Sequence, residues 1–210
     1  MNRATFILTL TFLSLLTTSC VSREIETMKF KLITKSEPFE LRDYSSYLVA
    51  ETEVSGDLED AGNKAFRPLF NYISGANRTK ASIAMTSPVT QEPTSEKIAM
   101  TAPVGQTATD KGWIVSFTMP SEYTMETLPT PESNKVTLRE VPAKRMASVT
   151  YSGGWGENLY KKNLKKLEAW ISEQGYKVLS KPMWARYNSP MTLWFLRRNE
   201  ILIEVEKTEN

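Results

Sequence analysis

The chain has 210 residues, of which 40% are apolar and 24% charged, as is typical of one large globular domain or two fused halves. With 26 basic and 24 acidic residues the net charge is only +2, so we expect no nucleic-acid partner. There is no histidine and one cysteine, Cys20, which excludes histidine-based catalytic triads, histidine-ligated zinc or haem iron, and an internal disulfide.

The N-terminus has the pattern of an export signal. A short positive start precedes an uncharged apolar run, residues 4–16, that is too short to span a bilayer. A small residue directly before Cys20 resembles a bacterial lipobox, although Thr17 stands where leucine is usual. We therefore expect residues 1–20 to be a signal peptide, Cys20 to carry a lipid, and 21–36 to be a tether. Plain secretion and an uncleaved anchor are the alternatives.

If Cys20 is lipidated, the protein is held at a membrane of the bacterial cell envelope, on its periplasmic face. The acyl chains then supply membrane attachment without a spanning helix. Lipidation also accounts for a single unpaired cysteine in an exported protein, because the thiol becomes a thioether.

Nine short segments have the alternation, or the β-branched and aromatic content, of β-strands, with turn residues at their ends. They are 39–41, 47–54, 83–85, 98–100, 113–119, 136–141, 145–151, 183–187 and 201–205.

Two segments have helical spacing of apolar residues, 58–73 and 157–174. Asp57 is suited to cap the first, and Pro68 inside it predicts a kink or a break. The lysines of the second helix either form a patch that faces anions or lie on a solvated face.

An internal repeat relates the two helices. Val54-Ser55-Gly56 precedes the first helix and Tyr151-Ser152-Gly153 the second, at an offset of 97 residues. The halves, about 37–119 and 136–207, thus both follow a strand–helix–strands order. Because neither half buries its helix adequately alone, we expect the sheets to pair about a pseudo-twofold axis, with a ligand seam between the halves.

A shorter repeat is sharper: Ile83–Val89 (IAMTSPV) recurs as Ile98–Val104 (IAMTAPV). Proline fixes an extended residue before it and removes a ladder donor, so two neighbouring strands that end at proline are expected. Met85 and Met100 then either fill irregular core space or line an adaptable apolar pocket.

The shorter repeat and four further segments together resemble the SOUL family of haem-binding proteins. The carrying segments are 44–54 (YSSYLVAETEV), 62–75 (GNKAFRPLFNYISG), 186–190 (RYNSP) and 197–200 (RRNE). The resemblance covers about residues 37–207. It implies an α+β fold, with a distorted antiparallel sheet or barrel of eight or nine strands and two main helices, related to GyrI-like effector-binding domains.

The resemblance also implies binding of haem or another tetrapyrrole, without catalysis, in an apolar groove around the first helix. The ligand-binding residues expected on this basis are Lys64, Phe66, Arg67, Leu69, Phe70, Ile73, Met85 and Met100, with Arg78 a further partner for the propionates. Phe66 and Phe70 are one turn apart, so both can touch one flat ligand. The alternatives are that these phenylalanines pack on the sheet and that the basic residues are only solvated.

Two features distinguish this chain from the family it resembles. Some family members are proposed to use a histidine as a ligand to iron, and this chain has no histidine. Any protein ligand to iron here would therefore be Met85, Met100 or Tyr72. Positions aligned with basic residues of mammalian relatives are polar and uncharged: Asn63, Asn71 and Thr192. Arg197–Glu200 at the last strand either form an internal ion pair or clamp a ligand carboxylate.

Two other function classes remain open. A GyrI-like carrier or sensor of flat or cationic apolar molecules would use Glu122, Glu126 and Glu140 as cation partners. An enzyme would have to rest on residues such as Tyr151 and Glu157. No nucleophile–base pair is recognisable, so we expect no enzyme.

Overall fold

The computed structural model describes residues 25–79 and 95–208. The predicted signal peptide, Cys20 and Met85 lie outside the described residues. The strands are β1 (Phe30–Ser36), β2 (Phe39–Tyr44), β3 (Tyr47–Val54), β4 (Asn77–Arg78), β5 (Val104–Ala108), β6 (Trp113–Thr118), β7 (Thr130–Pro131), β8 (Thr137–Val141), β9 (Lys144–Tyr151), β10 (Tyr176–Val178), β11 (Met183–Arg186) and β12 (Asn199–Lys207). The helices are α1 (Leu58–Ile73), α2 (Glu157–Glu173) and the 3-10 turn η1 (Trp194–Leu196).

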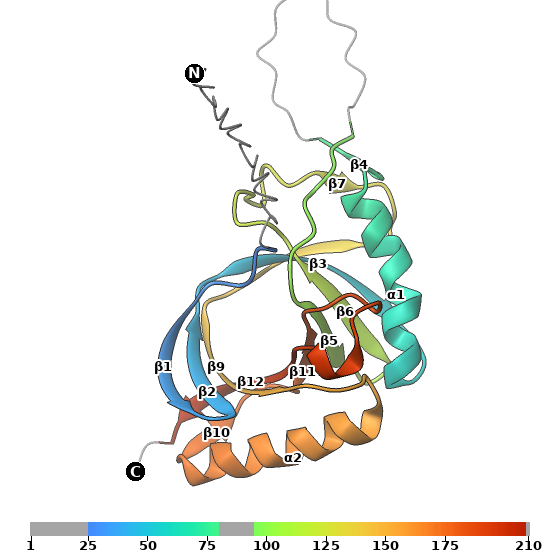
Figure 1. Ribbon diagram of the computed structural model, residues 1–210. Helices are drawn as coiled ribbons and strands as arrows, with labels where there is room; N and C mark the ends of the chain where they lie inside the picture. The colour runs from blue at the N-terminus through green and yellow to red at the C-terminus, as the bar shows by residue number, and fades with distance from the viewer. Residues whose placement is uncertain (1–24, 80–94, 209–210) are drawn as a thin grey trace, which may run out of the picture.

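Ten of the strands form one antiparallel sheet, shown in Figure 1. Its order is β1-β2-β9-β12-β11-β5-β6-β3-β8, and β10 adds to β12. The order is symmetric about the β11–β5 pair, and the halves exchange strands, because β2 pairs with β9 and β3 with β8. This confirms the expected fold class and pseudo-twofold repeat. The sheet is open rather than a closed barrel, with β1 and β8 at its edges.

The two helices cover equivalent parts of the sheet: α1 contacts β3 and β6, and α2 contacts β9, β10 and β12 (Figure 1). Asp57 caps α1, since its Oδ1 accepts the N–H of Asp60 at 2.8 Å. Pro68 does not split the helix, which is continuous from Leu58 to Ile73. The proline sits on a partly exposed side of α1, away from the apolar face that fixes the helix on the sheet.

Separate apolar clusters lie under the two helices. Leu69 and Phe117 belong to the cluster under α1, and Leu167 and Trp184 to the one under α2. Strand alternation sends β12 residues to both faces: Ile201 joins the α2 cluster, and Leu202 joins a smaller cluster on the other face.

The face away from the helices also buries an ion pair. Glu200 on β12 is 0% exposed, and its carboxylate accepts hydrogen bonds from Arg42 and Arg198. The pairing expected for the RRNE segment is thereby confirmed. Because Arg198 is neutralised internally, a ligand clamp at this point is wrong.

Two further sequence expectations need correction. Residues 30–36, assigned to a tether, form edge strand β1, so the domain begins before residue 37. Residues 98–100 form no strand, although Ile98 is buried against the end of α1, where its N–H donates to Ile73 O. The expected neighbouring partner, 83–85, lies outside the described part of the chain.

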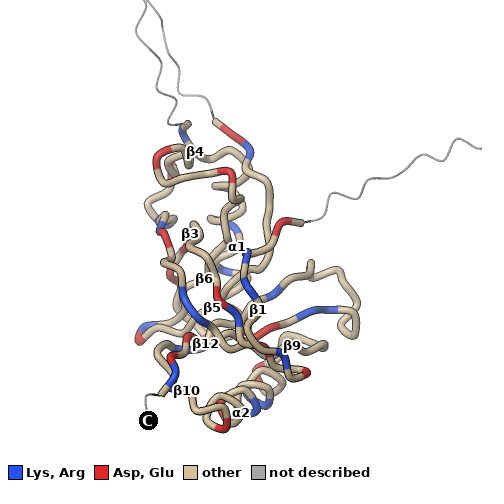
Figure 2. Tube along the Cα trace, turned by 90° about the vertical axis from the view of Figure 1, so that its left-hand side faces the viewer, with Lys and Arg blue, Asp and Glu red and all other residues tan. Residues whose placement is uncertain are grey.

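Basic and acidic residues are distributed along the described chain and do not form separate patches. Figure 2 shows basic and acidic positions interspersed along the described chain, in keeping with a net charge of +2. In the part of the chain that the structure describes, no helix has the length and apolar character needed to cross a lipid bilayer.

Candidate functional site

Two phenylalanines of α1 project from the core along one flank of the helix. Phe66 and Phe70 are 41% and 44% exposed, and their rings stack with centroids 5.4 Å apart. The Phe66 ring also makes an edge-to-face contact with Phe117 of β6, with ring centroids 5.7 Å apart. The sheet thus supports the aromatic surface without consuming it.

Other predicted groove residues have different positions. Leu69 and Ile73 are buried in the core under α1, so they support the phenylalanine pair rather than edge a groove. Tyr72 is also buried, and its hydroxyl donates to Pro129 O at 2.8 Å, which makes it unavailable to a metal at the surface.

The predicted basic residues do not join the phenylalanines. Lys64 and Arg67 line a hollow of about 870 Å³ beside α1, together with Asn71 and residues of β3. Lys64 pairs with Asp60 and donates to Ser55 O. Arg78 lies on β4, beyond the C-terminal end of the helix. Hence none of the three is placed by the structure as the cation next to Phe66.

An apolar loop around η1 is the feature that the sequence reading missed. Its exposed large side chains are Met191, Leu193, Trp194, Phe195 and Leu196, with Trp194 at 63% and Met191 at 90% exposure. Five such residues in one short loop form an unusual solvent-facing apolar group. The composition of residues 191–196 (MTLWFL) was the available signal, but alone it also fits a buried segment.

A chain of contacts places this loop beside the N-terminal half of α1. The Arg186 guanidinium lies against Gly62, because a Cβ built there would fall 2.4 Å from Nη2. The same guanidinium is 5.2 Å from the Trp155 ring, and Arg197 covers that ring at 4.3 Å. Arg197 also donates its backbone N–H to Trp194 O.

Met100 is placed near the other end of the phenylalanine flank. It is 45% exposed and lies in the segment between Ile98, bonded to the end of α1, and Thr101, whose hydroxyl donates to Thr118 O. The site therefore consists of the Phe66–Phe70 pair, with the η1 loop beyond one end of the pair and Met100 beyond the other. We call this surface the α1 flank.

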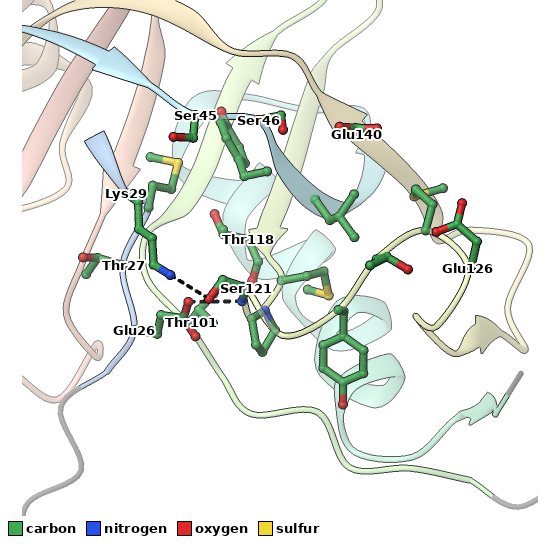
Figure 3. A pocket seen from close by; sticks show the side chains of 18 residues that line it. Glu26, Thr27, Lys29, Ser45, Ser46, Thr101, Thr118, Ser121, Glu126 and Glu140 are labelled. Carbon is green, nitrogen blue, oxygen red and sulfur yellow. Dashed lines mark hydrogen bonds between the residues drawn. The ribbon is translucent and has the colours of Figure 1, made fainter. Parts of the chain in front are cut away.

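A separate cavity of about 300 Å³ is lined mainly by residues 26–29, 45–48, 118–121 and 123–126. Figure 3 shows the side chains that line it. The N-terminal segment forms one wall, held by Ser121, whose N–H donates to Glu26 and whose hydroxyl accepts from Lys29. The apolar part of its lining includes Met28, Met119, Met125, Tyr47 and Tyr123. Its charged lining residues are three glutamates and one lysine: Glu26, Glu126, Glu140 and Lys29. Of the three predicted cation partners, Glu126 and Glu140 line this cavity and Glu122 does not.

Tyr151 and Glu157 were the residues on which an enzyme would have to rest. Tyr151 and Glu157 are separated by the loop 152–156, and burial raises the pKa of the Tyr151 hydroxyl above its ordinary range. Within residues 25–79 and 95–208, no three Cys, Asp or Glu side chains are grouped so as to hold a metal ion.

Sequence comparison finds the family model described as SOUL heme-binding protein over residues 25–204. Two curated relatives are the Heme-binding protein 1 of Xenopus tropicalis and that of Xenopus laevis. Both are 25% identical to this chain, over 83% of it and 94% of their own length.

Solved structures with the same fold include the C-terminal domain of EcmrR, at a TM-score of 0.56 and 14% identity, covering 86% of this chain and 100% of that domain. A Listeria innocua protein described as a hydrolase has a TM-score of 0.54 at 12% identity, covering 82% of this chain and 94% of its own. At these identities the likeness shows the fold alone.

Proposed function

The chain belongs to the SOUL heme-binding protein family, and from this premise we propose that it binds haem or another tetrapyrrole on the α1 flank, without catalysis. The single observation that carries the proposal is the exposed, stacked pair of Phe66 and Phe70. A tetrapyrrole is a flat apolar plate, and an exposed aromatic face gains free energy when such a plate covers it.

The apolar η1 loop supports this proposal, because a plate needs contact on more than one side. Trp194 and Phe195 stand out from the protein near the N-terminal half of α1. A ligand held between them and the phenylalanines would remove apolar surface on both elements from water.

The metal is secondary in this account. The chain has no histidine, and Met100 is the one predicted iron ligand placed with an exposed side chain in the described residues. Binding then depends on burial of the plate, so a metal-free porphyrin should bind nearly as tightly as haem.

The proposal predicts a shift of the Soret band when hemin is added to the purified protein, with partial loss of tryptophan emission. Trp155 and Trp194 lie close enough to the α1 flank to report on occupancy. An absorption and fluorescence titration measures both. No change in either signal at tens of micromolar hemin would contradict the proposal.

We also propose that the protein is a lipoprotein of the cell envelope, anchored through Cys20. The support is the sequence pattern at residues 4–20. Metabolic labelling with a radioactive fatty acid tests it: labelling should be lost in Cys20→Ser, and equal labelling of the variant would overturn the proposal.

The cavity of Figure 3 favours a second candidate, a carrier or sensor of flat or cationic apolar molecules. Three glutamates against one lysine favour a cation at its rim, and methionines and tyrosines suit an apolar body. About 300 Å³ is at the lower end for small-molecule pockets. Cationic dyes should then raise the melting temperature more than porphyrins do, and the reverse order would count against this candidate.

A further inference from the structure

Arg186 stands out among the arginines for the partners it lacks. Its guanidinium lies between two indoles, 5.2 Å from the Trp155 ring and 5.0 Å from the Trp184 ring. It makes one hydrogen bond within the described residues, from Nη2 to the side-chain oxygen of Gln106 at 2.8 Å. Arginine has five N–H donors, so most of its hydrogen-bonding capacity is left unused by the described chain.

Four other arginines are paired with carboxylates, and Arg197 donates to two backbone carbonyls. The pairs are Arg42–Glu200, Arg198–Glu200, Arg145–Asp43 and Arg139–Glu51. No carboxylate of the described residues lies within 4 Å of the Arg186 guanidinium. Glu59, three residues before Gly62 on α1, instead accepts the backbone N–H of Glu157.

The surroundings make this charge costly to keep. Burial lowers the pKa of Arg186 to about 10, and no carboxylate raises it again. The guanidinium also needs the space left by Gly62, since a side chain at that position would overlap it. A cation that is desolvated without an anion favours any anionic group that reaches it.

The position of Arg186 connects it to the α1 flank. Gly62, Phe66 and Phe70 are spaced four residues apart and so follow one stripe of the helix. The guanidinium at Gly62 therefore lies about 6 Å along the helix axis from the level of Phe66. A second cation, Arg197, lies over the Trp155 ring, the same indole that Arg186 contacts. The Arg197 guanidinium donates to the carbonyls of Thr192 and Pro190.

We propose that Arg186 binds a carboxylate of an apolar ligand whose body covers Phe66 and Phe70. The inference rests on the proposed function and adds what the ligand must carry: an acid group near the N-terminal end of the α1 flank. An arginine that presents free N–H groups suits a carboxylate, which can accept two of them. Neutral and cationic apolar molecules are disfavoured at this surface.

The test compares hemin with hemin dimethyl ester, which keeps the plate and removes both carboxylates. Wild-type protein should bind hemin at least tenfold more tightly than the ester. Arg186→Gln should weaken hemin binding about tenfold and leave ester binding within twofold. Equal effects on the two ligands, or no effect on hemin, would overturn the inference and leave the proposed function standing.

A second variant keeps the charge and moves it. Gly62→Ala should displace the guanidinium and weaken hemin selectively, whereas Gly154→Ala, where an added Cβ meets nothing within 4 Å, should not. If Arg186→Gln loses its circular-dichroism spectrum, the Gly62→Ala result decides. Failure of wild-type protein to bind either compound would overturn the proposed function, and the inference with it.

Discussion

Replacing Glu200 with glutamine should lower the free energy of unfolding by about 3–5 kcal/mol, the usual cost of removing one partner of a buried ion pair. The carboxylate accepts Arg42 Nη1 and Nη2 at 2.9 and 3.0 Å and Arg198 Nη2 at 2.6 Å. The hydroxyls of Tyr187 and Thr150 also donate to it, at 2.7 and 3.1 Å. Without its charge, Arg198 loses its carboxylate partner and Arg42 keeps only Glu40 among its carboxylates.

Urea unfolding of the variant measures this loss, with Glu206→Gln as the control. Glu206 lies on the same strand but pairs with Lys177 at the surface, so its replacement should cost less than about 1 kcal/mol. Similar losses for the two variants would show that the network does not stabilise the sheet.

The same carboxylate sets a pH dependence. Burial opposes ionisation of Glu200, but the hydrogen bonds and charges of Arg42 and Arg198 outweigh it and lower its pKa to about 2. The unfolded chain binds this proton near pH 4.3. The stabilisation is therefore complete above that pH and is lost as the pH falls toward 2. The difference between wild type and Glu200→Gln should shrink over the same interval.

The double variant Phe66→Ala, Phe70→Ala should weaken tetrapyrrole binding about a hundredfold. Covering one phenylalanine contributes about 1.5 kcal/mol or more, and each 1.4 kcal/mol is a factor of ten. Because both rings are more than 40% exposed in the free protein, the cost in folding stability should be much smaller than the loss in binding.

The matched control removes apolar surface elsewhere. Leu32 on β1 and Leu179 after β10 are each 47% exposed and lie away from α1. Alanine at both positions should leave porphyrin affinity within twofold in a fluorescence titration. If the control loses affinity as the phenylalanine variant does, binding is nonspecific adsorption to apolar surface.

Local rules predicted much of the fold. The bounds of α1 follow from Asp57 and the apolar spacing, and the structure has the same bounds. The repeat around the two helices predicted the pseudo-twofold sheet, because each half leaves one helix face to be buried. These features depend on neighbours in sequence, or on a pattern that occurs twice.

What the sequence hid depends on contacts distant in sequence. Strand β1 (FKLITKS) has no regular alternation and is exposed along its whole length, so only its pairing with β2 makes it a strand. Arg186 and Arg198 are both arginines near one strand end. The Arg198–Glu200 pair, only two residues apart, was predicted, whereas the contacts of Arg186 with Gln106 and two indoles were not.

The candidate site was predicted in part. Phe66 and Phe70 are exposed as a binding surface requires, and Leu69 and Ile73 are not. Lys64 and Arg67 are near Phe66 in sequence, but a helix turns by 100° per residue and places them on another side. In the proposed site, Arg186 and the η1 loop take their place.

The central claim is that an apolar plate is held on the α1 flank and not in the second cavity. Methyl NMR of the nine methionines, during titration with diamagnetic zinc protoporphyrin, tests it most directly. Ring currents should shift Met100 and Met191 and leave Met28, Met119 and Met125 in place. Large shifts of the three cavity methionines, with Met100 and Met191 unmoved, would contradict the account.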